Sequence, residues 1–287
     1  KVQWVRLMQQ LDLSARKTEI QTLPASEVEK LAAAFGLQPE RRMLQAKAIF
    51  YSDKLLAHDQ LQPDFHKVLL TAVQDSDEYS TLMRIFGLYP IAAIPVAIVT
   101  HRVFDEIAEW HQLPPGGLQT EGTITAFGPA ETLEFSGETI REILKRSRQN
   151  PLAIPLPSDA DRKTLSVTFA PVINQDLVAD YDRPGAMVWG DTQLEIDPDN
   201  PRAYYYFTHA YFKNEPVLQV NYVIWYSARG GPNSPLIERG HLDGLTVRVS
   251  LANSGRPFMV DIMNNCGCYH FFLLRKEKVE QSRHSRL

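Results

Sequence analysis

The apolar positions of the N-terminal third of the chain recur at helical spacing. Val28, Leu31 and Phe35 lie three and four residues apart, which places them on one face of an α-helix. Ser26 is expected to cap this helix, with Glu29 reaching back to it in a capping box. Further helices are expected over residues 39–57, 64–73, 77–86 and 103–110.

The pattern changes after the sequence Pro-Pro-Gly-Gly at 114–117, which is a strong break. Short runs rich in β-branched and aromatic residues follow, and such runs are typical of strands. Turns at 213–216 and 253–256 connect neighbouring runs directly, so the sheet is expected to be mainly antiparallel. Strands are expected over 123–127, 132–135, 165–169, 203–212, 217–226, 245–251 and 257–263, and one helix over 138–148 behind Ser136 and Gly137.

These patterns together predict an α+β protein. A helical N-terminal region covers residues 1–115. A mainly antiparallel β region with the single helix 138–148 covers 116–274, and a polar tail covers 275–287.

Composition narrows the function classes only slightly. Hydrophobic residues make up 44% of the 287-residue chain and charged residues 22%, which is ordinary for a soluble globular protein. The net charge of −4 gives no electrostatic reason to expect nucleic-acid binding. Because Lys1 begins the chain, we expect a processed or trimmed protein, either cytoplasmic or exported with its signal removed, and the compartment and oligomeric state stay open.

One long apolar segment bears on membrane contact. It starts at Ile85 and ends at Val99, and Pro90 and Pro95 interrupt it. A membrane-spanning helix needs about 20 apolar residues, so this segment is too short. We expect a buried segment with two bends, and contact with a membrane surface is the less favoured alternative.

Reactive side chains gather near the C-terminal end of the β region. Cys266, Cys268 and His270 lie within five residues, and His241 and Asp243 lie upstream on the loop expected to enter strand 245–251. The two expected strands form a hairpin, and counting from its turn places Cys266 opposite this loop. The hairpin 241–270 is therefore the predicted site.

A metal-dependent enzyme, in particular a hydrolase, is the leading expectation. Thiolate, imidazole and carboxylate ligands favour zinc or another transition metal. Three ligands spaced two residues apart on a straight strand would span about 13 Å, so one ion cannot hold all three unless the backbone curls at Gly267. The candidate ligands are His241, Asp243, Cys266, Cys268 and His270.

Three other readings of the cluster are kept open. A cysteine hydrolase or acyltransferase would use Cys266 or Cys268 as nucleophile, His241 or His270 as base and Asp243 to orient it, with a small molecule or peptide as substrate. A redox site would cycle the two cysteines through a strained disulfide. A binding or scaffold protein would use an aromatic strand surface around 204–212, and the cysteines would only be small hydrophobes.

Overall fold

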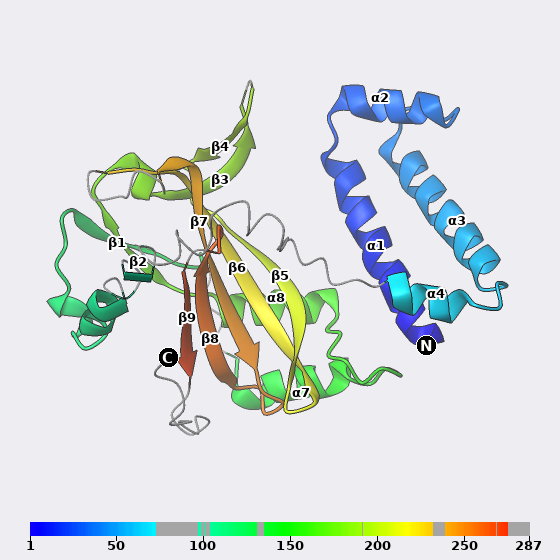
Figure 1. Cartoon of the computed structure of the whole chain (residues 1–287). Coiled ribbons are helices and arrows are strands. Elements are labelled where there is room, and N and C mark those ends of the chain that lie inside the picture. Colours follow the sequence, from blue (N-terminus) through cyan, green and yellow to red (C-terminus); the bar gives the residue numbers. More distant parts are fainter. Residues whose placement is uncertain are drawn as a thin grey trace. The chain divides into compact units, whose positions relative to one another are not determined.

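The computed structural model describes residues 1–72, 97–98, 101, 104–130, 135–190, 192–231, 239–267 and 269–274. The chain divides into two compact units, unit 1 from Lys1 to Gln112 and unit 2 from Leu113 to Leu287. The described residues confirm the expected α+β class: helices build unit 1, and antiparallel sheets dominate unit 2 (Figure 1).

Unit 1 is helical, with α1 Val2–Thr22, α2 Ala25–Ala34, α3 Arg41–Asp59 and α4 Phe65–Ala72. Its buried cluster contains Ile20, Val28, Ala32 and Leu44, from α1, α2 and α3. The expected cap at Ser26 is wrong, because α2 begins at Ala25 and the carbonyl of Pro24 accepts its first helical hydrogen bond, from Val28 N at 3.1 Å. Residues 104–110 are helical as expected, and the helix expected over 77–86 lies outside the described residues.

The large sheet of unit 2 has the strand order β4-β3-β6-β7-β8-β9, with β5 also paired to β6. A separate pair joins β1 and β2. Residue 135 follows the undescribed residues 131–134, so the strand expected over 132–135 falls mostly outside the described chain. The strands are β1 Thr123–Phe127, β2 Ile173–Leu177, β3 Pro184–Trp189, β4 Leu194–Asp197, β5 Ala203–Phe212, β6 Glu215–Arg229, β7 Gly240–Leu251, β8 Pro257–Asn264 and β9 His270–Leu274.

Helices α7 (Gly137–Ser147) and α8 (Asp159–Thr168) pack on one face of this sheet. Helix α7 starts behind Ser136 as expected, and Ser136 caps it, because its hydroxyl accepts the backbone N–H of Thr139 at 3.2 Å. The core between helices and sheet consists of Ile140, Ile143, Leu144, Leu165, Leu218, Val220, Tyr222, Val247, Val249 and Leu251.

The strand expected over 165–169 is wrong, because these residues end α8. The hydroxyl of Ser158 accepts the backbone N–H of Asp161 at 3.2 Å and so starts the helix. Leu165 is then fully buried against the sheet. A cap and an amphipathic face therefore outweigh the β-branched composition of these few residues.

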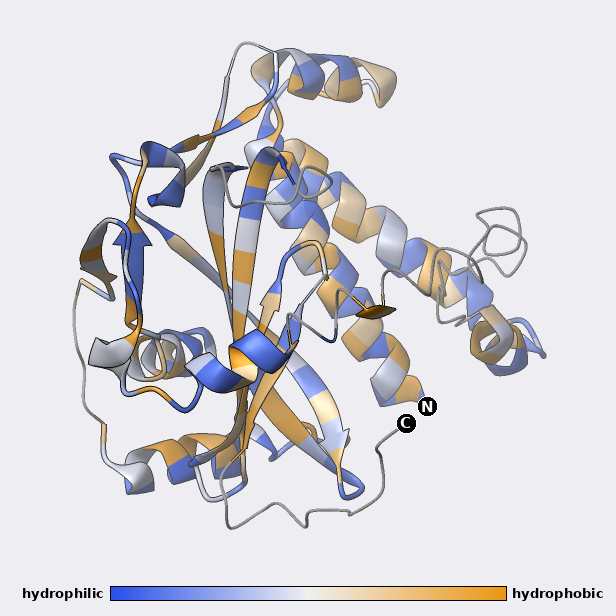
Figure 2. Ribbon diagram, turned by 60° about the vertical axis from the view of Figure 1, so that its left-hand side comes forward, coloured by the Kyte–Doolittle hydropathy of each residue, from blue (hydrophilic) through white to orange (hydrophobic). Residues whose placement is uncertain are grey.

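Strict alternation gives the sheet two unlike faces. On β6, Leu218, Val220 and Tyr222 point to the face covered by α7 and α8, while Gln219 and Asn221 point to the opposite face. Figure 2 shows hydrophobic and hydrophilic bands alternating along the long strands. We call the face turned away from the two helices the polar face.

Within the described ranges, no helix has both the length and the apolar character needed to cross a membrane.

Candidate active site

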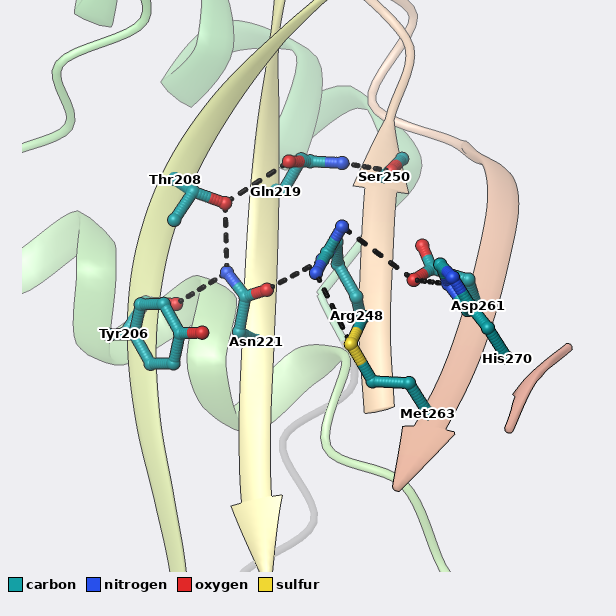
Figure 3. Close-up of polar contacts among 9 residues, drawn as sticks. All are labelled: Tyr206, Thr208, Gln219, Asn221, Arg248, Ser250, Asp261, Met263 and His270. Carbon is teal, nitrogen blue, oxygen red and sulfur yellow. Dashed lines mark hydrogen bonds and ion pairs between the residues drawn. The ribbon is translucent and has the colours of Figure 1, made fainter. Parts of the chain in front are cut away.

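Polar side chains from five neighbouring strands meet on the polar face. Strand register brings them together, because Asn221 lies opposite Arg248 and Arg248 lies opposite Asp261. Figure 3 shows these side chains directed toward one another. We call the group the polar network; it consists of Thr208 on β5, Gln219 and Asn221 on β6, Arg248 and Ser250 on β7, Asp261 on β8 and His270 on β9.

One half of the polar network is a chain of hydrogen bonds between side-chain amides and hydroxyls that ends at Arg248. Gln219 donates to Ser250 Oγ at 2.9 Å, and Thr208 donates to Gln219 Oε1 at 3.1 Å. Asn221 Nδ2 donates to Thr208 Oγ1 at 3.0 Å, while its Oδ1 accepts from Arg248 Nε at 2.8 Å (Figure 3). Since each amide uses both its donor and its acceptor, this chain fixes the position of the Arg248 side chain.

Arg248 brings a positive charge to the centre of the network. Its Nη1 lies 3.7 Å from Asp261 Oδ1, and its Nη2 lies 3.7 Å from the sulfur of Met263. The side chain is 27% exposed. A guanidinium has five N–H donors, so Arg248 keeps donors for a solvent molecule or ligand after these contacts and the bond to Asn221.

Asp261 is a wholly buried carboxylate. Its side chain has 0% exposure, and its Oδ1 accepts from His270 Nε2 at 2.8 Å. Its Oδ2 has no hydrogen-bond partner among the described residues. An unsatisfied buried acceptor costs about 1–3 kcal/mol, and such groups in native proteins call for an explanation.

His270 connects the buried carboxylate with solvent. Its side chain is 37% exposed, and its ring packs on Phe272 with centroids 4.1 Å apart. Because Nε2 carries the proton donated to Asp261, the neutral ring presents its lone pair on Nδ1, which has no hydrogen-bond partner in the described part of the chain. A histidine oriented in this way can take a proton from a substrate or bind a metal ion.

Asp243 and His241 occupy a different part of the sheet. They lie inside β7, not on the expected loop before it, and Asp243 pairs with Tyr226 on the helix-covered face. The carboxylate of Asp243 lies 3.0 Å from Arg229 Nε. His241 Nε2 lies 3.4 Å from the side-chain amide of Gln193. Asp243 and His270 are therefore on opposite faces of the sheet.

The expected hairpin itself is confirmed. β7 and β8 pair antiparallel, with Leu245 opposite Asn264, and Asn265 N donates to Gly244 O at 2.9 Å. Cys266 is exposed in the turn that follows, and Cys268 lies outside the described residues. Among the residues that the structure describes, no group of three or more His, Cys, Asp or Glu side chains could hold a metal ion. The metal site expected among these five candidate ligands stays a prediction, since Cys268 is not described.

Sequence reasoning missed Arg248, Asp261 and Asn221. The sequence could have indicated Arg248 and Asp261. Counting residues along both strands from the 253–256 turn places Cys266 beside 241–243, and the same count places Arg248 opposite Asp261. Opposite charges facing each other across an expected hairpin indicate a paired site. Asn221 joins the site through the pairing of β6 with β7. No short turn connects these two strands, so their register could not be derived by counting residues along the sequence.

Comparison of the chain with protein-family models, with curated proteins and with solved structures found no match in any of the three.

Proposed function

We propose that this α+β protein is a hydrolase of small esters or related acyl compounds that carry an anionic group, with His270 as its general base. The proposal rests on one observation above all: the 2.8 Å contact between His270 Nε2 and the fully buried Asp261 carboxylate. A carboxylate held in this way fixes the tautomer and orientation of a histidine and stabilises the imidazolium that forms during catalysis.

The reaction step uses water as the nucleophile. His270 Nδ1 accepts a proton from a water molecule while the water oxygen forms a bond to the acyl carbonyl carbon. The bond from that carbon to the leaving oxygen then breaks, and the imidazolium returns the proton to the leaving oxygen. The products are an acid and an alcohol. Asp261 acts as a positioning residue, because it contacts His270 and not the reacting atoms.

Arg248 supplies the preference for an anionic substrate. Its guanidinium is partly exposed, lies on the same face as His270, and keeps N–H donors after its contacts with Asn221 and Asp261. Carboxylates bind arginine through charge-assisted hydrogen bonds. A substrate carboxylate at Arg248 would hold the acyl group beside the His270 ring.

Two p-nitrophenyl esters test this proposal, the acetate and the hemisuccinate, which adds a carboxylate. H270Q should lower kcat/KM for both by about 10²-fold or more, the usual contribution of a general base. For the acetate, which does not use Arg248, D261N should lower kcat with little change in KM, because it disturbs the tautomer of His270. R248K should raise KM for the hemisuccinate alone.

The controls separate this site from its rivals. H58Q, on an exposed histidine of unit 1, should leave both rates unchanged, and melting curves should show that every variant is folded. Full activity in H270Q would overturn the proposal. Loss of activity in H241Q or after iodoacetamide treatment would favour the cysteine reading instead. Loss on chelation would favour the metal reading, with His270 as a ligand oriented by Asp261.

A further inference from the structure

A second candidate site lies on the opposite face of the sheet, beside α8. This apolar pocket has a volume of about 320 Å³ and is lined mainly by hydrophobic side chains and prolines. Ile224 and Tyr205 line it from β6 and β5, Val167 lines it from α8, and Phe127 and Ile173 line it from the β1–β2 pair. Its volume is at the lower end of the range for small-molecule sites, so its occupant is small.

The two buried tyrosines of the lining are neutral at physiological pH. Tyr222 donates to the carbonyl of Ser166 at 2.8 Å, and Tyr226 donates to Gln175 Oε1 at 3.2 Å. Burial raises the pKa of Tyr226 to about 12, and burial raises the pKa of Tyr222 further. Their protons are committed to protein acceptors, so each hydroxyl can offer a ligand only its lone pairs.

Arg202 is the one charged side chain among the described residues that line this pocket. It directly precedes β5, is exposed, and forms no ion pair in the described part of the chain. An apolar pocket with a single cation at its mouth is complementary to a molecule that is hydrocarbon at one end and anionic at the other.

We infer that this pocket binds a small organic acid, with its hydrocarbon part against Ile224 and Tyr205 and its carboxylate at Arg202. The site is independent of the proposed hydrolase chemistry, because the polar network lies on the other face of the sheet.

Calorimetric titration of the full chain with octanoate, butanoate and octanol tests the inference. Octanoate should bind with one molecule per chain. Butanoate should bind more weakly by about fourfold for each methylene removed from the pocket, which corresponds to about 0.8 kcal/mol per buried CH₂. Octanol, which lacks the charge, should bind about 1.4- to fivefold more weakly than octanoate, the range for an exposed ion pair.

Two variants and a control localise the binding. R202Q should weaken octanoate binding by the same factor, about 1.4- to fivefold, and leave octanol binding unchanged. A203W, at an exposed position of the lining, should fill the pocket and abolish binding of both. R256Q removes an exposed charge elsewhere in unit 2 and should bind octanoate normally.

Each alternative outcome would overturn the inference. Equal affinity for butanoate and octanoate would show that the apolar lining is not used. Unchanged octanoate binding in R202Q or in A203W would place the ligand elsewhere. Since none of these readouts depends on ester hydrolysis, failure here leaves the hydrolase proposal intact, and the reverse holds as well.

Discussion

At the scale of single residues, Asp161 and Asp261 are both buried carboxylates of unit 2, and their surroundings differ. Both oxygens of Asp161 are hydrogen-bonded, since Arg146 bonds both of them and Ser158 also donates to Oδ2 at 2.8 Å. Asp261 has one oxygen on His270 and the other without a partner among the described residues. The hydrogen bonds of Asp161 stabilise the start of α8. The unsatisfied oxygen of Asp261 lowers the stability of the fold, while its bonded oxygen holds His270 oriented toward solvent.

Asp161 should make the stability of the fold depend on acid. Hydrogen bonding to Arg146 holds the pKa of Asp161 below its ordinary value. A lowered folded-state pKa adds stability that is present above the unfolded-state pKa, near 4, and is lost as the pH falls through the folded-state pKa. D161N should lower the free energy of unfolding at pH 7 by about 1–2 kcal/mol, at the lower end for charged pairs because Arg146 is half exposed.

Urea unfolding at pH 7, 4 and 2.5 measures this difference. The gap between the native chain and D161N should be largest at pH 7 and should shrink toward pH 2.5. D159N is a matched control, because Asp159 is exposed in the same helical turn. A gap that is the same at all three pH values would contradict the assigned role of the charge.

The candidate site could be predicted only in part at this scale. His270 was selected from the sequence as a reactive side chain, but its partner was expected among His241, Asp243 and the cysteines. The side chains of a strand alternate between the two faces of the sheet. A residue that strand register places near His270 can therefore point to the opposite face. That is the case for Asp243, whereas Asp261 lies on the same face as His270.

At the scale of elements, the long hairpins and the short strand β1 were predictable, and several other short strands were not. β5 matches its expected bounds, and β6, β7 and β8 extend theirs by a few residues. The period-two pattern and the turn signals were sufficient for these strands. Strands β3, β4 and β9 have only four to six residues each, too few to show a period, and they form because a neighbouring strand offers a pairing edge.

One substitution in the turn between β5 and β6 should stabilise the fold. Lys213 and Asn214 both have positive φ, 52° and 63°, as in a two-residue type I′ turn. The left-handed conformation costs a lysine about 1 kcal/mol, and asparagine tolerates it better. K213N should therefore raise the free energy of unfolding by about 0.5–1 kcal/mol, measured by urea titration.

K213Q provides the matched comparison. It removes the charge that lies 5.8 Å from the Phe212 ring but keeps a side chain with no preference for positive φ, so it should not gain stability. A gain of equal size in both variants would point to the charge and not to the backbone.

At the scale of the whole molecule, the described residues of the two units form buried clusters of very different size. In the described residues of unit 1, the buried cluster has four members, with Val28, Ala32 and Leu44 at its centre. In the described residues of unit 2 the buried cluster has ten members, including Leu218 and Leu251. Several large apolar side chains of unit 1, such as Leu55, are exposed. Since burial of apolar surface is the main favourable term in folding, unit 1 should be the less stable of the two.

We therefore expect two separate transitions when the chain is heated in a calorimeter, with unit 1 unfolding first. Removing a buried leucine side chain costs about 2–5 kcal/mol. L44A should lower only the first transition, and L218A should lower only the second, because each residue is almost fully buried in its own core. The fragment 113–287 should keep the second transition at its original temperature. A single transition that shifts with both variants would mean that the units fold as one cooperative body.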